Sequence, residues 1–247
     1  VEKLREAEAE AEAQPSGDGS DCGAGPRVFD GVLDADGCDA VHSFATREGL
    51  GHRLYHREAG PSTPLEAALE TALAALGDDA PLVEYWWRDE WKHIEAHADV
   101  DEALAAEGGA LRYPRNGHVL YLRVGRRVQG PTCVWGAPDG GGATAAGDGE
   151  LLIVPAVAGR LLRFAGDLVH AVPRPADVWT APFVIGVAST PPEDFVRSVV
   201  LFNTWMEAPL GVPPHAHASS AGGGAGGAEG GGEGGGEGGG EGGGEGG

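Results

Sequence analysis

Short apolar runs separated by turn residues dominate the chain after residue 92. Val, Ile, Leu, Phe and Tyr gather in these runs, and Gly, Pro and Asn interrupt them. The runs cover 118–124, 150–156, 160–166, 182–188 and 197–205. Runs of this length and composition predict β-strands, and their frequent turns predict a sandwich, a barrel or a jelly roll.

A different pattern, with the period of an α-helix, covers residues 63–77. Thr63 is placed to cap the N-terminus, and Pro64 suits the first helical position. Glu66 completes a capping box, and Gly77 supplies the stop. Leucines recur on one face of this helix: Leu65, Leu69, Leu73 and Leu76. We therefore expect that face to pack against the core.

The chain before this helix predicts two further elements. A short strand is expected at 28–33, followed by a helix at 36–48. Residues 101–109 read as a short helical turn or a loop. The combined pattern predicts a mainly β fold with flanking N-terminal helices and a jelly-roll-like body.

Both ends of the chain differ in composition from the middle. Residues 1–25 join acidic helix formers, which lack an apolar stripe, to a linker rich in Gly, Pro and Ser. Residues 211–247 pass into a glycine tail with a GGGE period, which has nothing to bury. We expect 1–25 to be a helical or disordered lead-in, 26–210 to be the folded domain and 211–247 to be a disordered tail.

The charge of the chain is strongly negative, with 38 Asp and Glu against 17 Lys and Arg. Without the two ends, residues 22–218 still hold 26 acidic against 15 basic residues. Such a surface repels phosphate backbones and anionic membranes, so we expect no nucleic-acid or membrane partner. The same acidity mildly favours a neutral or basic peptide as substrate.

The cysteines and the apolar runs say little about the cellular compartment of the protein. Cys22, Cys38 and Cys133 are too few and too scattered for a disulfide framework or a thiolate zinc site, and Cys133 reads as a small buried apolar residue. The uncharged apolar run 178–192 is interrupted by prolines and too short to span a bilayer. No signal peptide is legible. The chain starts at Val1, however, so it can be a fragment and its localisation stays open.

A histidine and an aspartate lie two residues apart in the stretch 94–102, which reads IEAHADVDE. If 93–99 is a strand, His97 and Asp99 emerge on one face and can bind one metal ion together. Asp101 falls in the following turn, so we expect it either to support the ligands from outside or to be solvated.

A third ligand is expected from a distant strand, and His170 is the best candidate. It follows an apolar strand and a turn in RLLRFAGDLVHAVPRP. Two histidines and one carboxylate on one face of an ion leave the opposite positions open. Non-haem Fe(II) oxygenases use this facial arrangement.

With these residues in their order, the chain resembles the 2-oxoglutarate/Fe(II)-dependent dioxygenases, and within them the prolyl 4-hydroxylase-like branch. The likeness rests on the HxD at 97–99, the distal His170 and a basic residue, Arg197, that starts the next strand in RSVVLFNTW. The flanking stretches 28–44 and 155–175 also resemble segments of that branch.

The resemblance implies a fold, a reaction and a set of cofactors. The fold would be a double-stranded β-helix, and the cofactors Fe(II), 2-oxoglutarate and O2, with ascorbate as a further candidate. The reaction would hydroxylate a peptidyl, prolyl-like substrate while 2-oxoglutarate is decarboxylated to succinate. His97, Asp99 and His170 would hold iron, and Arg197 would pair with the far carboxylate of 2-oxoglutarate. Relatives that halogenate lack the carboxylate ligand, so Asp99 favours hydroxylation.

The sequence departs from the family pattern in two places. The family's basic residue usually follows the distal histidine by about ten positions, whereas Arg197 follows His170 by 27. Residues 176–195 would then form an inserted hairpin or loop near the site. The family's cofactor-binding tyrosine is also displaced, which leaves Tyr85 and Tyr121 as candidate cofactor contacts.

Other polar and aromatic residues have simpler interpretations. His93 reads either as a solvated histidine or as one that supports a ligand from outside, and His118 reads as a structural histidine. For the aromatic cluster of 84–91, which reads EYWWRDEW, we favour packing in the core over lining of a substrate groove.

Two other functions are compatible with the same residues. A non-catalytic jelly-roll binding module is one, although such modules are expected to lose a ligand or the anchoring cation. A zinc hydrolase built on the same His/Asp/His ligands is the other. Metal analysis and 2-oxoglutarate turnover discriminate among the three functions.

Overall fold

Strands predominate in the computed structural model, which describes residues 25–49, 51–126, 130–136, 150–173 and 196–214. The helical elements are α2 (Ala35–Glu48), η1 (Arg57–Ala59), α3 (Pro64–Ala75) and α4 (Glu102–Ala106). The strands are β1 (Arg27–Phe29), β2 (Arg53–His56), β3 (Leu82–Glu90), β4 (Ile94–His97), β5 (Asn116–Val124), β6 (Thr132–Trp135), β7 (Leu151–Val154), β8 (Leu161–Ala165), β9 (His170–Val172) and β10 (Val196–Trp205). The expectation of a mainly β fold with N-terminal helices is confirmed.

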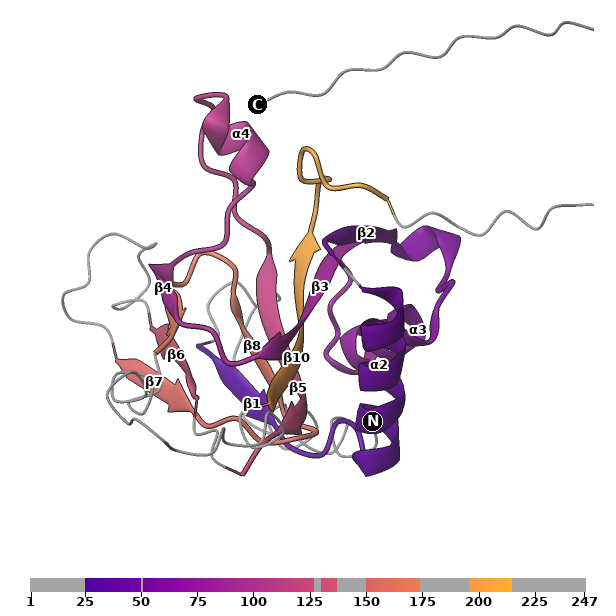
Figure 1. The fold of residues 1–247 in the computed structure, drawn as a ribbon. Coiled ribbons are helices and arrows are strands. Elements are labelled where there is room, and N and C mark those ends of the chain that lie inside the picture. Colours follow the sequence, from indigo (N-terminus) through magenta and orange to yellow (C-terminus); the bar gives the residue numbers. More distant parts are fainter. Residues whose placement is uncertain (1–24, 50, 127–129, 137–149, 174–195, 215–247) are drawn as a thin grey trace, which may run out of the picture. The chain divides into compact units, whose positions relative to one another are not determined.

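The strands form two antiparallel sheets (Figure 1). The larger sheet has the order β1-β8-β5-β10-β3-β2, and the smaller has the order β4-β9-β6-β7. The long strand β10 pairs with β5 on one side and with β3 on the other. Because neighbouring strands in this order are distant in sequence, the sheets bring together side chains from widely separated segments.

Helix α3 has the local signals that the sequence predicts. The Thr63 side chain accepts a hydrogen bond from the backbone N–H of Glu66, and the Glu66 carboxylate accepts one from Thr63. Gly77 adopts the left-handed φ of 66° that ends the helix. The four leucines of its apolar face are all buried: Leu65, Leu69, Leu73 and Leu76.

Helices α2 and α3 both cover one face of the larger sheet. Their buried side chains share a core with alternate residues of β3 and β10, such as Val83, Tyr85, Val200 and Phe202. A second core lies on the other face of the sheet and includes Val119, Val134, Val154 and Leu162. Each strand of the larger sheet therefore presents one row of side chains to the helices and the other row toward the smaller sheet.

Most of the predicted strands match observed ones. The runs at 118–124, 150–156, 160–166 and 197–205 correspond to β5, β7, β8 and β10. The run at 182–188 and the insertion at 176–195 lie outside the described residues. The sequence pattern missed β2, β3, β6 and β9, because these strands either are only three or four residues long or carry charged residues. The predicted limits of the lead-in, domain and tail stay predictions.

No helix among the described residues is both long enough and apolar enough to serve as a membrane span.

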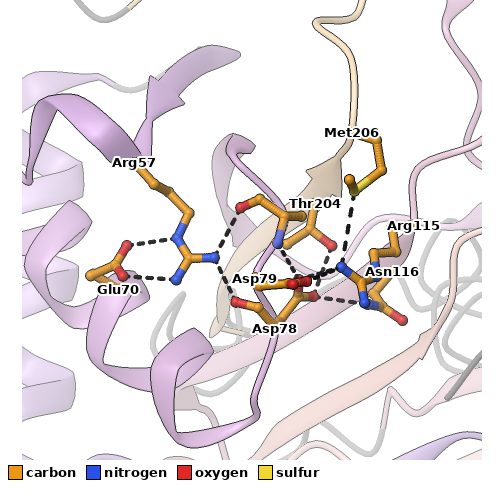
Figure 2. A network of polar contacts seen from close by, with 9 residues as sticks. Arg57, Glu70, Asp78, Asp79, Arg115, Asn116, Thr204 and Met206 are labelled. Carbon is orange, nitrogen blue, oxygen red and sulfur yellow. Dashed lines mark hydrogen bonds and ion pairs between the residues drawn. The ribbon is translucent and has the colours of Figure 1, made fainter. Parts of the chain in front are cut away.

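A network of buried and half-buried polar side chains ties α3 to the larger sheet (Figure 2). Arg57 donates to both carboxylate oxygens of Glu70, at 2.8 Å each. The same guanidinium donates to the backbone carbonyl oxygens of Asp78 and Ala80. It therefore fixes the loop that leads from α3 into β3.

Asp78 is the acceptor at the centre of this network. Its buried carboxylate accepts hydrogen bonds from the backbone of Ala80 at 3.0 Å, from Asn116 at 2.8 Å and from Thr204 at 3.0 Å. Burial by itself raises the pKa of Asp78, but the hydrogen bonds outweigh it and hold that pKa below its usual value. Asp78 thus links the loop to strands β5 and β10 as a carboxylate.

We expect Asp78→Asn to lower the free energy of unfolding at neutral pH by about 1–3 kcal/mol, because an acceptor for buried donors is lost. Since the pKa of Asp78 is lowered in the folded protein, its contribution is complete above the ordinary aspartate pKa. The contribution is lost as the pH falls through the folded pKa. Urea unfolding should therefore show a gap between wild type and variant that narrows in acid.

The matched control is Asp79→Asn, which removes the same charge from the next residue, whose side chain is 83% exposed. Its effect on unfolding should be much smaller than that of Asp78→Asn. Equal effects of the two variants would show that the buried network does not stabilise the fold.

Candidate metal centre

The candidate ligands meet where two short strands of the smaller sheet pair. His97, at the end of β4, lies directly opposite His170, the first residue of β9. The centroids of the two imidazole rings are 4.5 Å apart. Asp99 follows two residues after the end of β4. The structure therefore brings together the three residues that the sequence singled out as metal ligands, although they come from two distant segments.

The local backbone differs from the strand predicted for 93–99. The strand ends at His97, so Asp99 reaches the site from the following loop and not by strand alternation. The pairing between β4 and β9 also shifts register between Ile94 and His97. Such a bulge lets residues three apart share a face, and both Ile94 and His97 line the same cavity. His93 is exposed and lies outside the cluster.

The donor atoms of the three side chains converge on one point. Nε2 of His97 lies 3.5 Å from Oδ1 of Asp99, and Nε2 of His170 lies 3.8 Å from the same oxygen. All three ligand atoms lie within 4.8 Å of one another, and no other such group occurs among the described residues. Donors about 2 Å from an ion at right angles are about 3 Å apart, so small side-chain adjustments would close a site around a metal.

Hydrogen bonds orient each ligand toward that point. Nδ1 of His97 donates to the carbonyl oxygen of Glu95 at 2.8 Å, and Nδ1 of His170 donates to that of Leu168 at 3.2 Å. These bonds fix the tautomer in which Nε2 carries the free lone pair. The residues therefore fit a divalent metal ion, because both imidazoles present an acceptor nitrogen beside a carboxylate.

The carboxylate ligand is fixed from the opposite sheet. Oδ2 of Asp99 accepts a hydrogen bond from Nδ2 of Asn203 in β10, at 3.1 Å. Burial by itself raises the pKa of Asp99, but its interactions with His97, His170 and Asn203 outweigh it and hold that pKa below its usual value. Asp99 is thus ionised at neutral pH and oriented with one oxygen toward the imidazoles.

The two histidines differ in their surroundings. The His97 side chain is 43% exposed, and the adjacent Asp99 carboxylate, which favours the protonated imidazole, raises its pKa. The His170 side chain is only 9% exposed, and burial lowers its pKa. His170 is therefore the deep, neutral ligand, and His97 stands closer to solvent.

Arg197 lies in the same cavity as the three ligands, and its exposure is 4%. Its Nε donates to the carbonyl oxygen of Gly130 at 3.1 Å, and one Nη donates to Oγ1 of Thr132 at 3.0 Å. The guanidinium also stacks 5.2 Å from the ring centroid of Tyr121. No carboxylate among the described residues pairs with it, and burial lowers its pKa. Within the described part of the chain, Arg197 is thus a buried cation without an acidic partner.

The cavity that joins these groups has a volume of about 590 Å³. This size is typical of pockets that take small molecules. Besides the ligands and Arg197, its walls include Trp86, Arg88, Val119, Thr132, Leu201 and Asn203. The sequence missed Thr132, Asn203 and Arg88, although the period of two along β3 and β10 places the latter two on the cavity face.

The structure places the two candidate tyrosines differently. The hydroxyl of Tyr121 bonds to Oγ1 of Thr132 at 2.7 Å, so Tyr121 supports the residue that holds Arg197. The hydroxyl of Tyr85 bonds to Glu66 of α3 on the other face of the sheet. The prediction that Tyr85 contacts a cofactor is wrong, because strand alternation turns its side chain toward the helices.

Asp101 is not solvated, which corrects one of the two alternatives expected from sequence, and its hydrogen bonds are to residues other than the three ligands. It is buried, caps helix α4 by accepting from the backbone of Leu104, and pairs with Arg112. It also accepts from the backbone of Leu210. Its role is to fix the loop that follows Asp99.

The comparisons with known proteins find likeness among solved structures only. No family model and no curated protein matches the sequence. A Pseudomonas putida prolyl-4-hydroxylase is 17% identical, with 73% of this chain and 86% of that chain covered and a TM-score of 0.48. HygX from Streptomyces hygroscopicus with nickel and 2-oxoglutarate bound is 15% identical, with 78% and 91% covered and a TM-score of 0.43. The non-heme alpha ketoglutarate dependent epimerase SnoN from nogalamycin biosynthesis is 14% identical, with 78% and 91% covered and a TM-score of 0.45.

We expect His170→Ala to weaken the binding of one Co(II) ion by at least about 100-fold, because even the loss of a group that orients a ligand costs 10–100-fold. Titration of the purified protein with Co(II), followed by its visible absorption, measures this change. His93→Ala removes an exposed histidine four residues before His97 and should bind Co(II) like the wild type. Equal binding by all three proteins would exclude the His97/Asp99/His170 site.

Proposed function

We propose that the chain is an Fe(II)- and 2-oxoglutarate-dependent dioxygenase with a double-stranded β-helix core and a catalytic domain over residues 26–210. The observation that carries this proposal is the convergence of His97, Asp99 and His170 in one cavity with the unpaired cation Arg197. A metal triad alone would serve many reactions. A triad that shares its cavity with a buried guanidinium, which no described carboxylate pairs with, suits a cosubstrate with two anionic ends.

The three ligands would hold the ferrous ion from one side. Two imidazole nitrogens and one carboxylate oxygen form the facial donor set that leaves the opposite positions open. When bound, the ferrous ion would supply activation of O2 coupled to decarboxylation of 2-oxoglutarate to succinate and CO2. The protein contributes orientation: Asn203 keeps Asp99 in place, and the carbonyl groups of Glu95 and Leu168 keep both imidazoles in place.

Arg197 would bind the far carboxylate of 2-oxoglutarate. Gly130 and Thr132 take two of its N–H groups, and the remaining donors can form the forked pair that suits a carboxylate. Because the guanidinium is desolvated, its attraction to an anion is stronger than at an exposed site. Leu201 and Val119 line the cavity with apolar surface and help to exclude water.

The oxidised substrate would be a peptidyl, prolyl-like group, as the resemblance of the sequence implies. Residues 1–25 and 211–247 would act as a lead-in and a tail outside the catalytic domain. Ascorbate is a further candidate cofactor that keeps the iron reduced. A zinc hydrolase on the same ligands is the alternative, but Arg197 would then have no anion to bind.

We expect the purified protein to form a coloured complex with Fe(II) and 2-oxoglutarate without oxygen, and to turn 2-oxoglutarate into succinate in air. Arg197→Gln should raise the KM for 2-oxoglutarate at least about tenfold, because a charge-assisted hydrogen bond contributes roughly 1.5–3 kcal/mol. A screen of proline-rich, basic and small-molecule substrates, read by succinate release, identifies the substrate class.

Two control variants distinguish the loss of a metal ligand from the loss of a positive charge. His170→Ala is the blank that lacks a ligand, and Arg126→Gln removes an exposed arginine outside the cavity. Arg126→Gln should leave the KM unchanged. Absence of the coloured complex in the wild type, with zinc bound in place of iron, would favour the hydrolase instead.

A further inference from the structure

A second arginine, Arg88, lines the cavity of the candidate metal centre. On β3 the side chains of Glu84, Trp86 and Arg88 alternate with those that face the helices, and all three line the cavity. Arg88 lies directly across from Val199 of β10, in the strand that also carries Arg197. Its side chain is half-buried, whereas Arg197 is buried. The cavity thus holds two guanidinium groups at different depths.

Arg88 has no hydrogen bond or ion pair to any residue that the structure describes. Arginines elsewhere behave differently: Arg57 pairs with Glu70, and Arg160 pairs with Asp30. In a chain with 38 acidic residues, a cavity arginine without an acidic partner among the described side chains is unusual. The position of Arg88 therefore leaves its charge available to a bound molecule.

The buried acids of the cavity are all committed to other partners. Glu84 accepts from His52 at 2.8 Å and from Nε1 of Trp205 at 3.1 Å. Asp99 belongs to the metal cluster and bonds to Asn203, while Asp101 caps α4. None of these carboxylates neutralises Arg88. The lining thus carries two arginines and four carboxylates, of which Glu102 is exposed and the other three are bonded to residues other than Arg88.

The charge of Arg88 acts on Arg197 within the cavity. Burial lowers the pKa of Arg197, and the positive charge of Arg88 lowers it further. The two cations therefore interact across the cavity. An anion bound at either arginine would relieve part of this repulsion.

The cosubstrate accounts for only one of the two guanidinium groups. Under the proposed function, one end of 2-oxoglutarate lies at the metal and the other at Arg197. Arg88 then remains beside apolar wall residues, including Trp86, whose indole stacks on His52 with ring centroids 4.5 Å apart. A guanidinium next to an aromatic wall suits a carboxylate on an organic scaffold.

We propose that Arg88 binds a carboxylate of the oxidised substrate, so that the enzyme selects acidic substrates. This inference rests on the proposed function and specifies its substrate class. It differs from the neutral or basic peptide that the overall charge favours, because it rests on one half-buried guanidinium of the cavity and not on the charge of the whole chain.

The test measures binding to wild-type protein loaded with Mn(II) and saturated with 2-oxoglutarate. The probes are matched pairs: short proline-containing peptides that differ only in Glu or Gln, and benzoate with benzamide. We expect a carboxylate to bind about tenfold more tightly than its amide, as one charge-assisted contact provides. In Arg88→Gln this preference should disappear, and Arg88→Lys should restore part of it.

Arg126→Gln, which removes the same charge outside the cavity, should keep the preference for the carboxylate. The inference is overturned if no carboxylate binds better than its amide, or if Arg88→Gln retains the preference. It is also overturned if Arg88→Gln weakens 2-oxoglutarate as strongly as Arg197→Gln does, because Arg88 would then hold the cosubstrate. Loss of Mn(II) and 2-oxoglutarate binding in the wild type would instead identify a failure of the proposed function.

Discussion

The antiparallel pairing of β4 with β9 is the contact on which the candidate metal centre depends. It places His97 opposite His170, and the irregular register after Ile94 turns His97 toward the cavity. A slip of one residue in either strand would turn one imidazole to the other face of the sheet. The pairing alone does not complete the site, because Asp99 lies beyond the strand and is held by Asn203 from the larger sheet. The centre therefore depends on how the two sheets pack against each other as well as on strand pairing within the smaller sheet.

The larger sheet separates stabilising from functional side chains by strand alternation. On β10, Val200 and Phe202 pack in the core with the helices, whereas Leu201 and Asn203 line the cavity. The helices thus form a rigid support behind the strands that carry polar groups. The cavity side of the strands can therefore carry ionised groups. Each buried acid of the cavity accepts hydrogen bonds from donors in a neighbouring segment, and these bonds stabilise its charge.

The sequence predicted those features whose signals are local. The capping residues of α3 and the apolar runs of β5 and β10 are complete within a short window, so these elements appear where expected. The short strand β9 and the side chain of Asp101 depend on partners distant in sequence, and no local pattern specifies them. For the same reason the cofactor role predicted for Tyr85 was wrong: its face was set by the pairing of β3 with β10, whose register no single segment determines.

The two cavity arginines differ in burial, so they would bind two different anions with different strengths. Arg197 is buried at 4% exposure, so its charge is poorly screened and its desolvation is already complete before a ligand arrives. Arg88 is half-buried, and water screens it in part. A given carboxylate would therefore gain more from Arg197 than from Arg88. Under the proposed function, the stronger contact would therefore be with 2-oxoglutarate and the weaker contact with the oxidised substrate.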